Sequence, residues 1–432
     1  MIEPISGSII RKYSGISGIL FLFLFVFYTL SHRTDGILEF QLLSLVLCLF
    51  SIVIGTRCKK ISQIIIVILS FQIFSLIGMT FFDPAENIAD KENYEDFVRE
   101  MLEMKSVKEL LSPIINFEMT GYTDISDMGY SLPLYICVYL FGWDAGLFIM
   151  GLLKLLCHTI SVVFIYKLSY SYIGFKNSMF VALLWGLNIN NSFFILAGLK
   201  ESLFVVAVLY AVYRMYIQIQ RPCLKNFFIF LFLSFFTILF RVVFPAFFIL
   251  TYIGYLVLFE IRSKKLRYLI AAIAFVLCLV TVMIIFSSSF QTIMYMMEED
   301  EEYTKVPIYL KIINGFIYPY PCIRLDGAKA NLLVASYSAI HTSFAIFAIM
   351  GLFYVVKYKT RQLFPILGVF SLNTLMLILT GFSMNIRFLY PTHILYYVFI
   401  PIGIAYYYKR LIYVPYMCFV FLIVVMYNQV FN

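Results

Sequence analysis

The sequence has little charge for its length. Only 13% of the 432 residues are Asp, Glu, Lys or Arg, whereas 62% are hydrophobic, and the mean hydropathy is +0.92. Soluble domains carry roughly a quarter charged residues, so an ordinary soluble protein is excluded and a polytopic membrane protein is predicted. Its apolar runs are about 20 residues long and lack strand-like alternation, which favours helices over a barrel.

Signals for metals, disulfides and separate domains are also missing. The eight cysteines show no CxxC or zinc-type spacing, so neither a disulfide framework nor a metal site is predicted, and we expect no cofactor. No internal repeat or low-complexity tract is found, and we interpret residues 1–432 as a single membrane domain. The first apolar run is too long for a cleavable signal peptide and no small-residue cleavage site follows it, so we expect none.

The apolar runs predict an all-α fold with about 13 transmembrane helices. Residues 131–141 also form an apolar run, but it is short and contains Pro133, which favours a re-entrant or interfacial helix. With that choice, the basic clusters all lie on the cytoplasmic side, as the positive-inside rule requires. The predicted spans are residues 15–30, 38–55, a third ending near 82, 146–167, 178–197, 200–217, 226–242, 243–260, 268–288, 334–356, 363–382, 388–407 and 413–431.

The net charge of +8 is explained by these short basic clusters between spans, so binding of nucleic acid is not predicted. Two long polar stretches, residues 83–130 and 289–333, then fall on the outer side. The first holds about half of the acidic residues of the chain. We expect the two outer loops, together with the helix at 131–141, to form the cap of an active site that faces away from the cytoplasm.

Four basic residues lie at outer helix ends or in an outer loop, against the positive-inside trend: Lys200, Arg241, Arg324 and Arg387. Ionisable groups at the bilayer boundary are costly, which makes them functional candidates. Binding of a phosphate or pyrophosphate is a physical reason to keep them there. The alternatives are arginines that reach lipid phosphates and, for Lys200 with Glu201, a charge pair at a helix N-terminus.

Carboxylates of the first outer loop are candidates for a general base. Asp83 comes first because it directly follows a span, and Glu86 and Asp90 come after it. With Pro84 next to it, Asp83 is alternatively a helix-ending residue. Asp124 and Asp127 are weaker candidates, for acceptor or metal contacts.

Aromatic and polar residues complete the candidate site. Tyr130, like other tyrosines of the outer loops, is suited either to stacking on a sugar ring or to an interfacial aromatic belt. Glu201 is a supporting residue beside Lys200. Lys154 and His158 lie one turn apart within a span, which favours helix packing over a proton or substrate path.

Three short motifs carry a family resemblance. The span that ends FFD at Asp83 precedes a long loop ending GYSLPLY, GLKES begins a helix at Lys200, and IRFLYP runs from Arg387 to Pro391. In this architecture the chain resembles the membrane glycosyltransferases of the GT-C type and the related O-antigen polymerases of the Wzy type. Its Phe-, Ile- and Tyr-rich, Lys-biased composition favours the polymerase.

The resemblance implies a glycosyltransferase that joins polyprenyl-pyrophosphate-linked oligosaccharide repeat units at the outer face of the bacterial inner membrane. It assigns the role of base or metal contact to Asp83 and pyrophosphate binding to Arg241, Arg324 and Arg387. The expected partners are the lipid-linked oligosaccharide, membrane lipids and a chain-length regulator protein. The alternatives are a GT-C transferase that adds single sugars from a polyprenyl-phosphate donor, and a flippase for lipid-linked oligosaccharides. Flippases usually have repeat-related halves, which are not found here.

Overall fold

The described part of the chain is all-α. The computed structural model describes residues 4–31, 37–82, 89–104, 106–112, 125–263, 265–266, 269, 308–317, 329–358, 360–380, 386–407 and 413–430, and within these ranges there is no strand. The first half contains α1 (Gly7–Ser31), α2 (Ile37–Gly55), α3 (Ile61–Phe82), α4 (Ala89–Glu103), α5 (Val107–Leu110), η1 (Ile125–Asp127), α7 (Met128–Phe141), α8 (Trp143–Ile173), α9 (Phe175–Gly186), α10 (Asn190–Leu196) and α11 (Glu201–Gln220). The second contains α12 (Leu224–Phe236), η2 (Thr237–Leu239), α13 (Phe244–Tyr255), η3 (Leu256–Glu260), α16 (Ile308–Ile317), α17 (Lys329–Lys357), η4 (Arg361–Leu363), α18 (Phe364–Thr380), α19 (Ile386–Tyr396), α20 (Phe399–Tyr407) and α21 (Tyr413–Val430).

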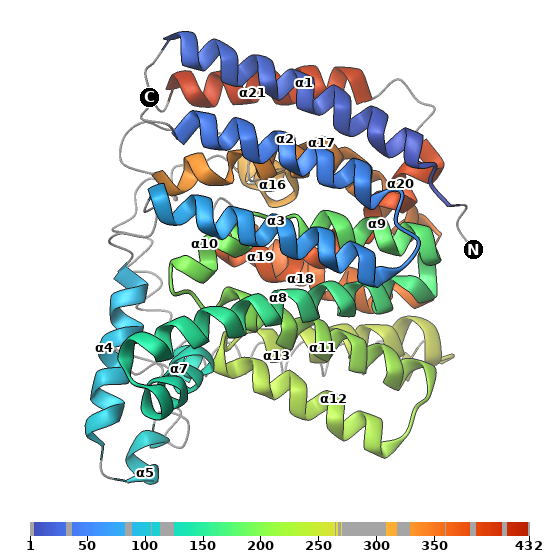
Figure 1. The fold of residues 1–432 in the computed structure, drawn as a ribbon. Coiled ribbons are helices and arrows are strands. Elements are labelled where there is room, and N and C mark those ends of the chain that lie inside the picture. Colours follow the sequence, from blue (N-terminus) through green and yellow to red (C-terminus); the bar gives the residue numbers. More distant parts are fainter. Residues whose placement is uncertain are drawn as a thin grey trace.

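The long helices run side by side as a bundle, and consecutive helices mostly run in opposite directions (Figure 1). Helices α1 and α21 lie together at one edge, α12 lies at the other, and α8, α9 and α11 lie between them. Helices α4 and α7 stand at one end of the bundle, where α4 packs on α7 and α7 packs on α8. The described part of the first polar loop is thus largely folded as helix.

The predicted count of about 13 spans is not confirmed. Among the described residues, five helices are long and apolar enough to cross a membrane, or up to seven if each of two bent helix pairs is one span. This supports a multi-pass membrane protein with fewer established spans than predicted. The predicted span 268–288 lies outside the described residues. The predicted span 334–356 is part of α17, which begins earlier, at Lys329.

Two predicted spans are broken rather than continuous. Residues 178–197 form α9 and α10, which meet at an angle of 41°, and residues 388–407 form α19 and α20, which meet at 52°. At the first break, a side chain of α3 supplies hydrogen-bond donors for the freed carbonyl groups. The Nε2 atom of Gln72 donates to the carbonyl oxygens of Gly186 at 2.8 Å and Asn188 at 3.0 Å. A broken helix is tolerated at membrane depth when its freed carbonyls find such donors.

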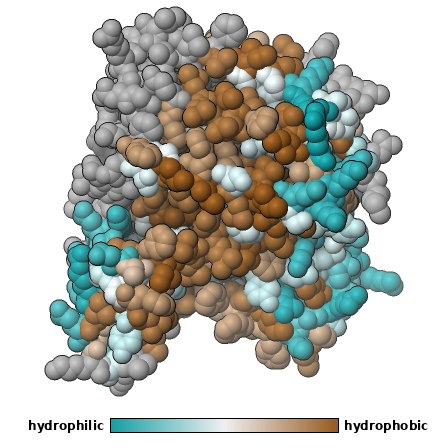
Figure 2. All heavy atoms as spheres, in the orientation of Figure 1, coloured by the Kyte–Doolittle hydropathy of each residue, from teal (hydrophilic) through white to brown (hydrophobic). Residues whose placement is uncertain are grey.

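Hydrophilic residues gather at the two ends of the bundle (Figures 1 and 2), and we call the end opposite α4 the basic end. It contains the α2–α3, α8–α9, α11–α12 and α17–α18 connections and the end of η3. The basic residues in these connections are Arg57, Lys59, Lys60, Lys176, Arg221, Lys225, Arg262, Lys265, Lys357 and Arg361. The opposite end, which carries α4, we call the α4 end. This segregation agrees with the positive-inside pattern, and a cytoplasmic basic end remains a prediction.

Helices α17 and α20 approach each other at two facing glycines. A Cβ atom at Gly351 would lie 2.0 Å from the carbonyl oxygen of Phe399, and one at Gly403 would lie 1.8 Å from that of Phe347. Both contacts are with backbone, which cannot move aside as a side chain can. Small residues are common where membrane helices pack backbone to backbone, and these two glycines set the distance between α17 and α20.

We therefore expect Gly403→Ala to separate α17 from α20. Overpacking costs about 1–3 kcal/mol, so the apparent melting temperature of the detergent-solubilised protein should fall by several degrees. Gly15→Ala is the control, because it lies within α1 with nothing within 4 Å of its Cβ position. That variant should melt no lower than the wild type. Equal melting temperatures for the two variants would contradict the close approach.

Candidate functional site

A buried carboxylate lies at the centre of the α4 end. The Glu201 side chain is fully buried, and its Oε1 atom accepts a hydrogen bond from Nε of Arg387 at 3.1 Å. The Nη2 atom of Arg241 lies 3.8 Å from the same oxygen and donates to the backbone carbonyl of Arg387 at 3.0 Å. Two arginines that are 146 residues apart in the chain therefore share one carboxylate.

Local structure explains how each of these residues is positioned. Glu201 is the first residue of α11, with Lys200 at its N-cap, where a negative charge is favoured by the helix dipole. Arg241 lies in the tight turn between η2 and α13, and its backbone N–H donates to the carbonyl of Thr237 at 2.9 Å. Arg387 lies at the beginning of α19. Three helix ends meet at this point.

The Arg241 guanidinium is held by aromatic rings as well as by the carboxylate. Its Cζ atom lies 4.2 Å from the ring centre of Phe388 and 5.7 Å from that of Phe204, which are cation–π distances. An arginine guanidinium stays protonated in proteins, so Arg241 carries a positive charge at neutral pH.

Lys200 points toward the first polar loop. Its Nζ atom donates to the Oδ1 atom of Asp127 at 2.5 Å and to the backbone carbonyl of Ser126 at 2.8 Å. The hydroxyl of Tyr94, from α4, donates to the same Asp127 oxygen at 3.4 Å. Burial, and then the charges of Asp127 and Glu201, raise the pKa of Tyr94, so its hydroxyl stays protonated and able to donate. Residues of the first loop thus contact the cation cluster directly.

Lys154 and Tyr130 extend the cluster toward the centre of the bundle. The Nζ atom of the buried Lys154 donates to the carbonyls of Phe194 at 3.3 Å and Ile195 at 2.8 Å, in α10. It lies 5.2 Å from the ring centre of Tyr130, whose ring lies 4.9 Å from that of Tyr94. Lys154 therefore contacts a broken helix on one side and an aromatic pair on the other.

The structure brings together four of the predicted site residues: Lys200, Glu201, Arg241 and Arg387. Tyr130 lies beside them through Tyr94 and Lys154. Asp83, Glu86 and Arg324 lie outside the described residues, and Asp90 lies in the first turn of α4 with its side chain outside the description. Their predicted roles stay predictions.

Sequence analysis gave no role to Tyr94, and it ranked Asp127 low. A signal for Tyr94 was present. Tyr94, Phe97, Val98 and Met101 follow the i, i+3, i+4, i+7 spacing of a buried helix face, and all four are buried. In the ranges that the structure describes, no group of three or more His, Cys, Asp and Glu side chains is arranged to hold a metal ion.

We expect Glu201→Ala to destabilise the protein strongly, because it leaves two largely buried guanidinium groups without their carboxylate. Removing one partner of a buried ion pair costs about 3–5 kcal/mol. In a double-mutant cycle, Glu201→Ala combined with Arg387→Ala should be less destabilising than the sum of the single changes. Thermal unfolding in detergent measures all three variants.

The matched control is Glu260→Ala at the basic end. Glu260 also pairs with an arginine, Arg361, but the two side chains are 43% and 51% exposed. An exposed pair contributes about 0–1 kcal/mol, so this change should have little effect. Equal destabilisation by Glu201→Ala and Glu260→Ala would show that burial of the Glu201 pair is not what matters.

No family model matches this chain, and neither a curated protein nor a solved structure matches it. The fold and composition show an all-helical protein with several apolar helices of membrane length, as expected of a multi-pass membrane protein.

Proposed function

We propose that this protein is a membrane glycosyltransferase that polymerises polyprenyl-pyrophosphate-linked oligosaccharide repeat units of a bacterial surface polysaccharide. The reaction would take place at the outer face of the inner membrane. The observation that carries the proposal is the meeting of Lys200, Arg241 and Arg387 at one end of the bundle, away from the basic end. Topology alone accounts for the basic connections, but it does not account for these three cations.

The charge balance of the cluster suits an anionic ligand. Lys200, Arg241 and Arg387 face only two carboxylates, Glu201 and Asp127, so one positive charge is left over among the five. A guanidinium offers five N–H donors in a planar fork that matches phosphate oxygens. Arg241 uses its Nη2 atom for the carbonyl of Arg387, and its other donors suit a phosphate. A pyrophosphate would neutralise the excess charge.

In the proposed reaction the cations bind the pyrophosphate of the donor. A carboxylate of the first loop takes the proton from the acceptor hydroxyl, whose oxygen attacks the anomeric carbon of the donor sugar. The bond between that carbon and the pyrophosphate oxygen breaks as the glycosidic bond forms, and polyprenyl pyrophosphate leaves. Fixed positive groups stabilise the charge that develops on the leaving group. The configuration at the anomeric carbon inverts.

The cluster residues have different roles in this scheme. Arg241 and Arg387 contact the pyrophosphate, as does Lys200, and Arg324 remains a further candidate from sequence. Glu201 accepts from Arg387 and lies beside Arg241, so it acts as a positioning residue that holds both guanidinium groups in one place. The base is assigned to Asp83, with Glu86 and Asp90 as the other candidates.

We expect Arg241→Ala and Arg387→Ala each to abolish formation of long polysaccharide chains. Removing one preorganised electrostatic group costs about 10²–10³-fold in rate. The measurement is a gel of surface polysaccharide from cells in which the variant replaces the native gene. Arg99→Ala is the control: Arg99 is on α4 at the same end, but its side chain is 57% exposed and pairs with Asp96 on its own helix.

The outcomes separate the proposal from its rivals. Normal long chains from both site variants, with the proteins present in the membrane, would overturn the assignment of the arginines. If deletion of the gene leaves a ladder with one sugar less per repeat unit, the protein adds single sugars. If deletion leaves lipid-linked units on the cytoplasmic side, it is a flippase.

We further expect Asp83→Asn to stop turnover while the donor still binds, because the substitution removes a base and leaves the cations in place. Purified protein, in single-turnover assays with a lipid-linked repeat unit, should retain donor binding and lose product by about 10²–10⁴-fold. Glu86→Gln and Asp90→Asn are the matched comparisons. Full activity of Asp83→Asn together with loss in one of the other two would move the base to that residue.

A further inference from the structure

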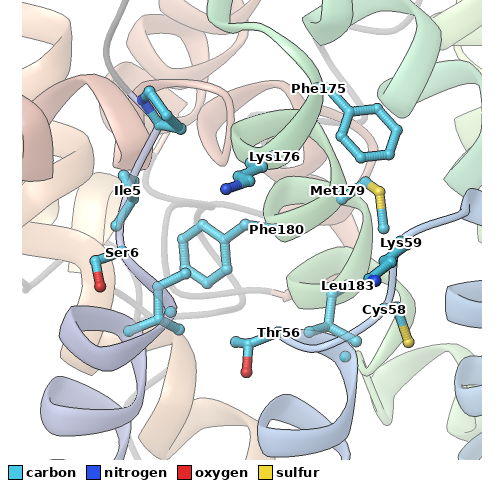
Figure 3. Close-up of a pocket in the computed structure, with 14 residues that line it drawn as sticks. Ile5, Ser6, Thr56, Cys58, Lys59, Phe175, Lys176, Met179, Phe180 and Leu183 are labelled. Atoms are coloured by element: carbon cyan, nitrogen blue, oxygen red, sulfur yellow. The ribbon is translucent and has the colours of Figure 1, made fainter.

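A second candidate binding site lies at the opposite end of the molecule from the Glu201 cluster. A pocket of about 470 Å³ opens at the basic end, between the start of α1, the α2–α3 connection and the start of α9 (Figure 3). Helices α3 and α8 each run from this end to the α4 end, so the pocket is separated from the Glu201 cluster by the length of a membrane-crossing helix. It is a separate site.

The pocket is built from three segments that are distant in the sequence. The backbone N–H of Ile5 donates to Oδ1 of the buried Asn177 at 2.9 Å, which fixes the chain before α1 against α9. Leu183 of α9 packs so closely on α2 that a Cβ at Gly55 would lie 2.4 Å from it. These contacts hold the walls in place.

Positive charge lines the mouth of the pocket. Figure 3 shows the side chains of Lys59 and Lys176 on its walls. Among the described residues, neither ammonium group has an ion-pair partner, and none of those that line the pocket is acidic. Helices α1 and α9 also begin here, and the first-turn N–H groups of a helix have no partner within it, so each contributes partial positive charge.

The inner wall of the pocket is apolar. Ile10, Met179, Phe180 and Leu183 line it, and all four are buried in the bundle. A ligand that satisfies both parts of the pocket has a negative headgroup joined to an apolar portion. The hydroxyl groups of Ser6 and Thr56 already bond to Ser8 and to the carbonyl of Val53, so charge rather than hydroxyl bonding would select the headgroup.

We propose that this pocket binds the phosphate headgroup of an anionic glycerophospholipid. The phosphate contacts Lys59 and Lys176, and the glycerol and first acyl carbons lie against Phe180 and Met179. Basic pockets between helices at a membrane face are suited to anionic headgroups. The pocket lies at the ends of apolar, membrane-length helices, where a phospholipid headgroup is at hand. This inference does not depend on the proposed glycosyltransferase activity.

The test compares lipid retention by the purified full-length protein. Wild type and the double variant Lys59→Gln/Lys176→Gln are exchanged into mixed micelles that contain equal amounts of phosphatidylglycerol and phosphatidylcholine, and bound lipid is measured by native mass spectrometry. Each basic residue near an anionic lipid is worth about a fivefold change in affinity, so the double variant should lose roughly 25-fold for phosphatidylglycerol. The control is Lys225→Gln/Lys265→Gln, two exposed lysines of the basic end outside the pocket.

In the second part of the test, inorganic phosphate alone is added as a competitor of the lipid, up to millimolar concentration. The proposal expects wild type to prefer phosphatidylglycerol, the control variant to behave as wild type, and phosphate not to compete with the lipid. Equal lipid retention by the pocket variant and the control would overturn it. Competition by inorganic phosphate, with no dependence on the acyl chain, would assign the site to a soluble phosphate and equally overturn the lipid.

Discussion

The α4 end of the molecule depends on one buried carboxylate. Glu201 is fully buried at the beginning of α11 and receives Arg387 from α19 and Arg241 from the turn before α13. Three charges in a region of low dielectric constant are tolerated only because opposite charges pair, since each charge alone would carry a large desolvation penalty. The three helix ends are thereby held in one arrangement, and the two arginines are held with them.

Polar residues within the bundle support this arrangement from the centre. Gln72 of α3 satisfies the carbonyls at the break between α9 and α10, and its Oε1 atom accepts from Ser192 at 2.7 Å. Asn191 in turn accepts a hydrogen bond from the hydroxyl of Ser202, one residue after Glu201 in α11. The broken helix is therefore linked by hydrogen bonds to the helix that carries the central carboxylate. A continuous helix through residues 178–197 would not offer these groups.

Much of this arrangement could be predicted from the sequence, and there are physical reasons why the remaining contacts could not. Arg241 and Arg387 stood out because they oppose the positive-inside trend, and they do share a carboxylate. For Lys200 and Glu201, a helix N-terminal position and membership of a charge cluster were treated as alternatives, whereas the structure shows both at once.

The count of about 13 spans is not confirmed because, among the described residues, several of the predicted runs form apolar helices of only 10–17 residues and two form bent pairs. The polar run from Asn188 to Ser192 marked the first break. The partner of Lys200 was ranked low because contacts between residues 73 positions apart cannot be derived from spacing.

Lys200 differs from the two arginines in what neutralises it. Its partner, Asp127, comes from the first polar loop, and the Asp127 side chain is 29% exposed, whereas Glu201 is fully buried. Breaking a partly exposed ion pair costs less free energy than breaking a buried one. Under the proposed function, an incoming pyrophosphate therefore displaces Asp127 from Lys200 more easily than it displaces Glu201 from the arginines. Asp127 and Tyr94 lie on the loop that carries the candidate base, so release of Lys200 to the ligand would be coupled to the position of that loop.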